Sequence, residues 1–230
     1  MALYAAKSLA LKTVGLALIN NDAGPPYERT FRKVFEANGG SVVGVVWQTP
    51  GEVDFRAQAN QLKDMPGIDA VFVASTAKEG AHLIRQSAEV GFKPTWLSIT
   101  TIESPDALQI AGSAMDGLIY AAEAYDPAAP ATQEFDKLYR EKFGEASQNY
   151  AANAYDAVGM LYEIMRGGNV RGPEIRDRLY QLHYTGVTGP VSFDRNGDAK
   201  KKIMIKKVAA GQYQIVVPLM ELTAADEGHE

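Results

Sequence analysis

A chain of 230 residues, of which 46% are hydrophobic and 22% charged, is long enough to bury one large core or two small ones and has no compositional signature of disorder. The formal net charge of −5 and the lack of a basic stripe with interleaved aromatic residues argue against a nucleic-acid partner, whose phosphates have to be neutralised. The absence of cysteine excludes disulfides, thiolate metal sites and cysteine nucleophiles.

Residues 1–12 favour the end of an amphipathic helix that leads into the first strand. The stretch is short and carries lysines at both Lys7 and Lys12, which does not match a secretory signal. We therefore expect the signal peptide of an exported parent protein to be absent from this chain. The longest apolar runs have the length of strands, and no membrane-spanning helix is expected.

The stretch 13–40 predicts a strand, a polar turn and a helix. The apolar run 14–19 is typical of a strand that is buried on both faces, and the polar turn 20–24 follows it. Pro25 and Pro26 favour a helix start, because the first N–H groups of a helix have no intrahelical partner in any case. In open α/β sheets ligands bind at the carboxyl ends of the strands, so the turn 20–24 is the first candidate site.

The same order of apolar run, turn and amphipathic segment recurs, which is typical of strands and helices that alternate around a parallel sheet. Further strands are predicted at 41–47, 69–74, 94–99 and 117–122, with helices that begin at Asp54, after 75–77 and near 105. Beyond residue 123 helices dominate, and we expect a domain boundary at 123–126. The predicted helices are 130–143, 147–165 and 173–182, and a β-rich tail follows at 187–193, 202–208 and 212–217.

Three polar turns follow the first, third and fourth predicted strands, at 20–24, 75–77 and 98–101. If these strands are parallel and joined by right-handed crossovers, the turns fall on one edge of the sheet and line a cleft with neutral hydrogen-bonding groups. The alternative is that they serve only as turns and helix N-caps, a role that Ser and Thr often fill.

Other candidate chemistry is weaker. The segment 194–198 begins like a calcium loop, but the twelfth position, which needs a bidentate Glu, is Ile205, so a hairpin turn is favoured. The three histidines lack the short spacing of two metal ligands on one helix face, and no phosphate-binding glycine motif or nucleophile elbow occurs. We therefore expect no catalytic residue, no metal site and no cofactor.

Several longer stretches carry a family resemblance. In chain order they are the turn 20–24 with the helix after it, DF at 54–55, DAVFV at 69–73, LIRQ at 83–86, AANAYDAV at 151–158 and GVTGPVSFDRNGD at 186–198. Together they resemble the periplasmic solute-binding proteins of branched-chain amino acid ABC transporters, which have the type I periplasmic-binding fold. The resemblance implies an α/β fold class: a three-layer, doubly wound, mainly parallel sheet in one lobe and a partial second lobe rich in helices.

By this resemblance, residues 1–123 with 201–230 form the complete second, C-terminal ligand-binding lobe, and 124–200 are the remaining part of the first lobe. The crossovers are expected near 121–126 and 199–202. Most of the first lobe is then absent from the chain, and the helices of 124–200 are expected to expose apolar side chains. These side chains are Leu138, Val158, Leu161 and Ile164. We expect a partner chain, a self-associated copy or a swapped dimer to cover them, or residues 124–200 to pack in a rearranged way.

The resemblance places ligand-binding residues in the three turns: Asn21, Asp22, Ala23, Ser75, Thr76, Ala77, Thr100 and Thr101. Ala23 stands where the family has an aromatic residue, and the second turn lacks the aromatic residue of leucine binders. Thr100 stands where amino-acid binders have the acidic residue that holds the ligand ammonium, and a neutral hydroxyl cannot supply that charge-assisted bond. An α-amino acid held in the usual way is therefore disfavoured, and an organic or aromatic acid fits no worse.

The leading function is that of the substrate-binding component of an ABC importer. Such a protein binds a small solute non-covalently by closing two lobes and presents it to a membrane permease. The parent protein is then periplasmic or extracellular. The alternative is a ligand-binding sensor or receptor domain of the same fold, and an enzyme is disfavoured because no nucleophile, metal or cofactor signature occurs.

Overall fold

The computed structural model describes residues 1–168 and 171–220, with side chains for 1–168 and 171–216. The chain divides into two compact units. The first contains Met1–Ala122 and Ile205–Pro218, and the second contains Glu123–Met204. The assignment of 1–123 with 201–230 to one lobe of a larger fold, and of 124–200 to the other, stays a prediction. Residues 221–230, which that assignment includes, lie outside the described residues.

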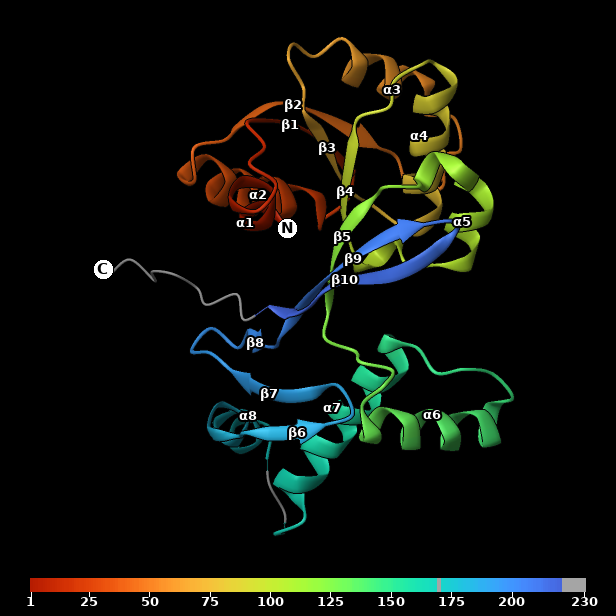
Figure 1. The fold of residues 1–230 in the computed structure, drawn as a ribbon. Helices are drawn as coiled ribbons and strands as arrows, with labels where there is room; N and C mark the ends of the chain where they lie inside the picture. The colour runs from red at the N-terminus through yellow and green to blue at the C-terminus, as the bar shows by residue number, and fades with distance from the viewer. Residues whose placement is uncertain (169–170, 221–230) are drawn as a thin grey trace. The chain divides into compact units, whose positions relative to one another are not determined.

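The first unit is built on a seven-stranded sheet with the strand order β10-β9-β5-β4-β3-β1-β2 (Figure 1). The strands are β1 (Thr13–Ile19), β2 (Ser41–Gln48), β3 (Ala70–Ala74), β4 (Thr95–Ile99), β5 (Ile119–Glu123), β9 (Ile203–Ala209) and β10 (Gln212–Met220). Neighbouring strands from β2 to β5 pair in parallel, as predicted from the repeated order of strand and helix. The fold is therefore a mainly parallel α/β sheet, in agreement with the expected fold class.

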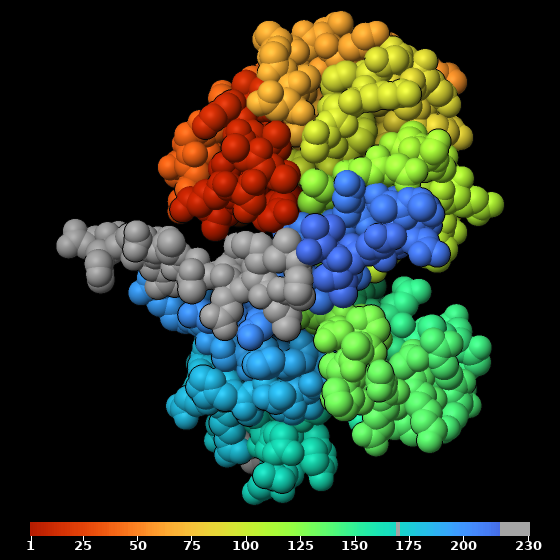
Figure 2. Space-filling view, in the orientation of Figure 1, coloured from red at the N-terminus to blue at the C-terminus, as the bar shows by residue number. Residues whose placement is uncertain are grey.

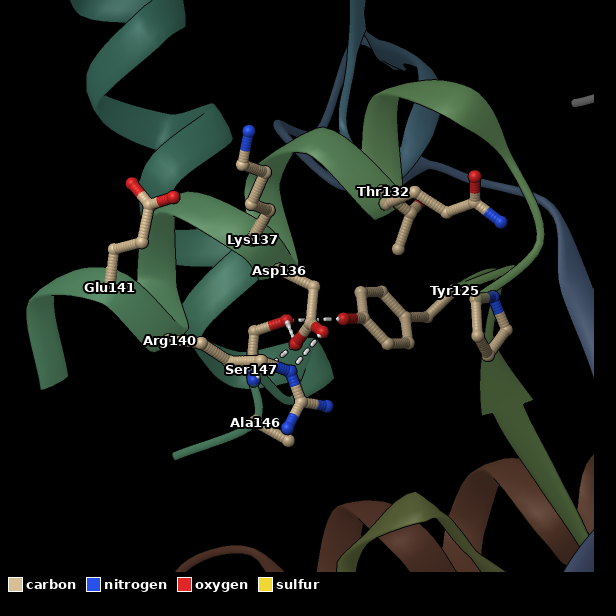
Figure 3. A pocket seen from close by; sticks show the side chains of 10 residues that line it. Tyr125, Thr132, Asp136, Lys137, Arg140, Glu141, Ala146 and Ser147 are labelled. Carbon is tan, nitrogen blue, oxygen red and sulfur yellow. Dashed lines mark hydrogen bonds and ion pairs between the residues drawn. The ribbon is translucent and has the colours of Figure 1, made fainter. Parts of the chain in front are cut away.

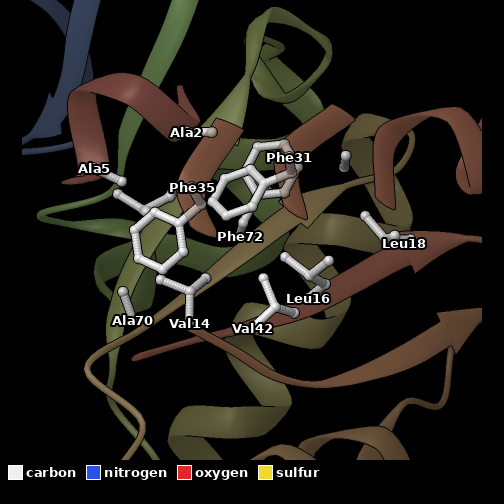
Figure 4. Close-up of a cluster of buried hydrophobic side chains, with 12 residues drawn as sticks. Ala2, Ala5, Val14, Leu16, Leu18, Phe31, Phe35, Val42, Ala70 and Phe72 are labelled. Atoms are coloured by element: carbon white, nitrogen blue, oxygen red, sulfur yellow. The ribbon is translucent and has the colours of Figure 1, made fainter. Parts of the chain in front are cut away.

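Helices cover both faces of this sheet. The helices of the first unit are α1 (Ala2–Lys7), α2 (Gly24–Ala37), α3 (Arg56–Lys63), α4 (Ala77–Glu89) and α5 (Pro105–Ala111), with the 3-10 turns η1 (Thr100–Ile102) and η2 (Gly112–Met115). On one face, α1 and α2 pack against β1 and β3, where the ring of Phe31 stacks on Phe72 with 4.4 Å between centroids (Figure 4). On the other face Gly15 leaves room for Leu62 of α3, and a Cβ at Gly15 would lie 3.3 Å from Leu62 Cδ2.

The strands β9 and β10 belong to the sheet of the first unit. The backbone N–H of Gly117 donates to the carbonyl of Val208 at 2.8 Å, and the N–H of Val208 donates to Leu118 at 2.9 Å. In the space-filling view, the blue atoms of β9 and β10 lie directly beside the yellow-green atoms that precede β5 (Figure 2). Of the β-rich tail predicted from the sequence, the strands at 202–208 and 212–217 therefore extend the sheet that the first half of the chain forms.

The second unit combines three helices with a small antiparallel sheet. The helices are α6 (Pro130–Phe143), α7 (Asn149–Met165) and α8 (Gly172–Gln181), and the strands are β6 (Tyr184–Gly186), β7 (Gly189–Phe193) and β8 (Ala199–Lys200). The predicted strand 187–193 is corrected here, because Gly186 pairs with Gly189 in a hairpin that begins at Tyr184. The hairpin turn predicted at 194–198 is confirmed: β7 pairs antiparallel with β8, and the Asp194 carboxylate accepts the N–H of Asn196 at 2.8 Å.

The buried carboxylate of Asp156 joins α7 to the β6–β7 hairpin. Its oxygens accept the backbone N–H groups of Val187 and Thr188, both at 2.8 Å, and the Thr188 hydroxyl at 2.6 Å. The Thr188 hydroxyl oxygen in turn accepts a hydrogen bond from Lys201 Nζ at 3.0 Å. Gly186 has no room for a side chain, since its Cβ would overlap this carboxylate. One charged group thus satisfies several buried donors.

The helices of the second unit expose apolar side chains. Leu138 is 53% exposed, Val158 66% and Leu161 40%, which confirms three of the four predicted positions. The prediction for Ile164 is wrong, because it is only 5% exposed. Ile164 follows Met160 and Asp156 at intervals of four residues, so it lies on the stripe of α7 that faces the interior of the unit. Within 1–168 and 171–220, no helix is long and apolar enough to cross a membrane.

Candidate functional site

The strands β1, β3 and β4 are neighbours in the sheet and run parallel, so their carboxyl ends lie on one edge. Leu18 pairs with Ala74, and Val73 pairs with Ser98, which aligns the last residues of the three strands. The polar turns that follow these strands are therefore brought together by the topology, as the sequence predicted. This edge is the candidate site in the first unit.

The first turn is held by its own backbone and by Asn21. The Asn21 carboxamide oxygen accepts the N–H of Ala23 at 2.9 Å, and the N–H of Gly24 donates to the Asn21 carbonyl at 3.2 Å. The N–H of Asn20 donates to the carbonyl of Gln48 at 2.8 Å, which ties the turn to the end of β2. Asp22 and Ala23 are exposed. The Asn21 side chain shapes the turn, and Asp22 is the carboxylate that this turn presents to solvent.

The second turn presents a hydroxyl at the start of α4. Ser75 is buried, 7% exposed, and its hydroxyl donates to the Thr76 carbonyl at 3.3 Å. Thr76 is the N-cap residue of α4, but its exposed side chain makes no capping bond. Ala77 is half-buried in the first turn of the helix. The N–H groups of a first helical turn favour groups that accept hydrogen bonds, and the acidic Glu79 already supplies negative charge to this turn of α4.

The third turn is the 3-10 turn η1. Ser98, which the sequence places in this turn, lies inside β4 instead, and its buried hydroxyl donates to the Val73 carbonyl at 2.8 Å. Thr100 and Thr101 form the turn itself, and both are half-buried. The Thr101 hydroxyl oxygen is shielded from water and has no hydrogen-bond partner among the described residues. Of the two threonines, Thr101 is thus the one whose hydroxyl is enclosed by protein.

A fourth segment, the loop that follows β2, is attached to α4 by polar side chains that sequence reasoning missed. Glu79 Oε1 accepts the N–H of Gly51 at 2.8 Å, and Gln48 Nε2 donates to the Glu79 carbonyl at 3.0 Å. About two helical turns further along α4, the Gln86 carboxamide oxygen accepts the N–H of Phe55, and its NH2 group donates to the Val53 carbonyl. Glu79 and Gln86 are buried polar residues that interrupt a mainly apolar face of α4. This interruption of the apolar pattern is the sequence signal by which they could have been identified.

The second unit contains a separate pocket of about 490 Å³ between α6 and the segment before α7 (Figure 3). Asp136 lies at its centre, where its carboxylate accepts bonds from Arg140 Nε at 2.6 Å and from the Ser147 backbone and hydroxyl. The Tyr125 hydroxyl is 2.7 Å from the Ser147 hydroxyl. The Arg140 bond and the Ser147 donors hold the pKa of Asp136 below its usual value. These polar groups form hydrogen bonds with one another, which is typical of residues that stabilise the fold.

Metal-binding geometry does not occur in the part of the chain that the structure describes, where no three His, Asp or Glu side chains are close enough to hold an ion. His82 lies half-buried on α4, with Nδ1 3.5 Å from Arg85 Nη2. Burial and the charge of Arg85 lower the pKa of His82, and Glu79 counteracts this shift. The candidate chemistry is therefore hydrogen bonding by turns and a helix end.

The chain has clear relatives among known proteins. A family model described as "Periplasmic binding protein" matches residues 1–213. The Leu/Ile/Val-binding protein homolog 1 of Brucella abortus is 30% identical over 174 residues, which are 72% of this chain and 46% of that protein. The chain spans about half the length of the curated relatives it matches.

Solved structures resemble this one over nearly all of its length. A leucine-binding protein from Thermotoga maritima has a TM-score of 0.83 at 26% identity, covering 95% of this chain and 64% of that one. A solute-binding protein of an ABC transporter from Rhodopseudomonas palustris, solved with 3,4-dihydroxybenzoic acid, has a TM-score of 0.75 at 25% identity. That match covers 95% of this chain and 62% of the other.

Proposed function

This chain belongs to the periplasmic binding protein family. We propose that it is part of the substrate-binding component of an ABC importer. The protein binds a small solute non-covalently, by closure of the two lobes of its parent, and carries out no covalent chemistry. The relatives solved as parts of ABC transporters favour this function over a sensor or receptor domain of the same fold.

The observation that carries the proposal is the shared edge of β1, β3 and β4. Because the strands are parallel, three groups lie at neighbouring strand ends. They are the exposed turn around Asp22, the Thr76 hydroxyl, which makes no capping bond, and the η1 turn with Thr100. Such an edge supplies hydrogen-bonding groups and a helix N-terminus to a small polar ligand without a nucleophile or a metal. The proposed ligand-binding residues are those of the three turns: Asn21, Asp22, Ala23, Ser75, Thr76, Ala77, Thr100 and Thr101.

We propose that the solute is an organic acid, including aromatic acids, with an amino acid as the alternative. Thr76 and the N–H groups at the start of α4 favour a group that accepts hydrogen bonds. Thr100 is neutral, so it provides no fixed charge for an α-ammonium group. One relative was solved with 3,4-dihydroxybenzoic acid, and another is a leucine-binding protein, so the family offers both kinds of ligand.

The proposal extends to the whole parent protein. Residues 1–123 with 201–230 are the second, C-terminal lobe, and 124–200 belong to the first lobe, with crossovers near 121–126 and 199–202. The parent acts outside the cytoplasmic membrane, in the periplasm or extracellular space, and its further partner is an ABC permease. No nucleic acid, metal or cofactor takes part.

A thermal-shift screen of the full-length parent tests this function. The probes are leucine, isoleucine, benzoate, 4-hydroxybenzoate and 3,4-dihydroxybenzoate, with glucose as a control. A ligand that binds only the folded state raises the melting temperature in proportion to the logarithm of its concentration above Kd. We expect at least one aromatic acid to raise it and glucose to leave it unchanged. A shift with leucine alone would contradict the argument from Thr100, and turnover of a probe would contradict the non-enzymatic function.

We also propose that the chain in isolation self-associates through its second unit. Eight large apolar side chains of α6 and α7, here called the α6–α7 apolar face, are between 40% and 66% exposed. They are Leu138, Phe143, Tyr150, Tyr155, Val158, Leu161, Tyr162 and Met165. Six of them lie on α7, so much of this exposed apolar surface belongs to one helix. Monomers rarely leave such an area uncovered, and a second copy supplies a matching surface.

Light scattering coupled to size exclusion measures this association. The wild-type chain is expected to elute with a mass above 24.9 kDa that rises with concentration. Val158→Glu should shift it to the monomer, because a charge at the centre of an apolar contact is costly. Glu163→Gln, on the opposite side of α7, is the matched control and should keep the wild-type mass. A monodisperse wild-type monomer across the concentration range would contradict self-association.

A further inference from the structure

The backbone around Thr100 and Thr101 is held from a distant part of the chain. Ile102, the last residue of η1, and the next two residues, Glu103 and Ser104, receive three kinds of contact from β9 and β10. The bond from Tyr213 to Ser104 joins residues 109 positions apart, so no local pattern predicts it. Both strands belong to the same compact unit as the turn.

The Tyr213 hydroxyl is the centre of this attachment. It accepts the backbone N–H of Ser104 at 3.0 Å, and its single proton has two carbonyl acceptors within reach, Ile102 at 2.8 Å and Ser104 at 2.9 Å. The Tyr213 ring packs edge-on against Tyr120, with 5.7 Å between centroids. Burial raises the pKa of Tyr213 to about 12, so the hydroxyl remains a donor at neutral pH. One phenol thus fixes the backbone on both sides of Glu103.

A half-buried ion pair adds a second attachment. Lys206 Nζ lies 2.7 Å from one carboxylate oxygen of Glu103 and 2.9 Å from the other. The side chains are 12% and 31% exposed, so water screens the pair less than a surface pair. Burial and the negative charge of Glu103 raise the pKa of Tyr120, which keeps that phenol neutral beside the pair.

Inside the turn, the buried Ile102 packs against α4, where a Cβ at Gly80 would lie 2.9 Å from its Cδ1. Within η1 the N–H of Glu103 donates to the Thr100 carbonyl at 3.0 Å, but the enclosed Thr101 hydroxyl has no hydrogen-bond partner among the described residues. A 3-10 turn of three residues has poor internal hydrogen-bond geometry, so its position depends on its flanks. One flank is β4, and the other is the segment that Tyr213 and Lys206 hold.

We propose that Tyr213 and Lys206 are positioning residues, which fix the Thr100–Thr101 turn at the sheet edge in the orientation that the solute requires. The inference rests on the proposed function, since it assigns these residues to the same ligand edge. Neither residue needs to contact the solute. Their role is to reduce the freedom of a turn that would otherwise have to be ordered when the solute binds.

The test uses substitutions that nearly keep the volume of the side chain and remove one interaction. Tyr213→Phe removes the hydroxyl and keeps the ring, and Lys206→Met removes the ammonium and keeps the length of the side chain. Lys207→Met, on the same strand but exposed, is the matched control. Hydrogen exchange of backbone amides is measured on this chain, and Kd is measured on the full-length parent by calorimetry with 3,4-dihydroxybenzoate and with leucine.

In both variants we expect the amides of 101–104 to exchange about tenfold faster, while the amides of β1 and β3 keep their rates. The Kd of the probe that binds should rise about tenfold, and Lys207→Met should change neither quantity. Unchanged exchange at 101–104, or unchanged Kd in spite of faster exchange, would overturn the proposal. So would a uniform rise across the whole first unit, because it indicates a general loss of stability. If neither probe binds the wild-type parent, the proposed function fails, and the exchange data still decide whether the two residues hold the turn.

Discussion

Replacing Asp156 by alanine is expected to lower the free energy of unfolding of the second unit by about 3 kcal/mol or more. The substitution leaves the N–H groups of Val187 and Thr188 and the Thr188 hydroxyl without their acceptor in a site where Asp156 is only 1% exposed. Each buried donor without a partner costs about 1–3 kcal/mol, more when the partner was charged. The Thr188 hydroxyl then keeps only its contact with Lys201 Nζ.

Two probes separate the effect on the two units. Both tryptophans, Trp47 and Trp96, are in the first unit, so their fluorescence reports its unfolding in urea, whereas far-ultraviolet circular dichroism reports both units. In Asp156→Ala, part of the dichroism transition should move to lower urea while the fluorescence transition stays in place. Asp177→Ala on the surface of α8 is the control and should move neither. Equal shifts of both probes would show that the units do not unfold separately.

Replacing Gly24 by alanine is expected to destabilise the first unit by about 3 kcal/mol, an overpacking effect. A Cβ at this position would overlap the backbone carbonyl oxygen of Ile19 and lie 2.7 Å from the ring of Trp47. Because the carbonyl belongs to β1, it cannot move aside as a flexible side chain would. Either α2 or the turn 20–23 must shift, and that turn is part of the candidate site.

Trp47 provides the measurement for this variant, since its fluorescence is sensitive to movement of α2 and to unfolding of the first unit. We expect a changed emission spectrum and a lower urea midpoint for Gly24→Ala. Gly167→Ala is the matched control, because a Cβ there meets no atom within 4 Å and the backbone does not adopt a positive φ. A midpoint equal to that of wild type would mean that the close approach of α2 to β1 is not required.

Much of the fold could be predicted from the sequence because its signals are local. Apolar runs flanked by polar turns identify β1, β3 and β4, and Pro25 and Pro26 identify the start of α2. The parallel sheet then follows from the alternation of strands and helices, and it brings the three turns to one edge. These inferences need no knowledge of distant contacts.

The predictions from the sequence fail where contacts between distant residues determine the structure. The predicted exposure of Ile164 follows from the part of the first lobe that the resemblance implies to be absent, and only the packing of α7 against its own unit shows which stripe of α7 is covered. The strand β6 is too short for a periodic signal and depends on pairing with β7. The attachments of Glu79 and Tyr213 join segments 28 and 109 residues apart, so spacing along the chain does not reveal them.

The place where the solute binds distinguishes the edge of the first unit from the pocket of the second, and amide chemical-shift mapping of the isotope-labelled full-length parent measures it. The solute is the probe that gives the largest thermal shift in the screen. Among the residues of this chain, we expect the largest shift changes at 20–23, 75–77 and 100–101, at the carboxyl ends of β1, β3 and β4. Shift changes that avoid these turns and gather instead around Asp136 and Ser147, in the pocket of the second unit, would contradict it.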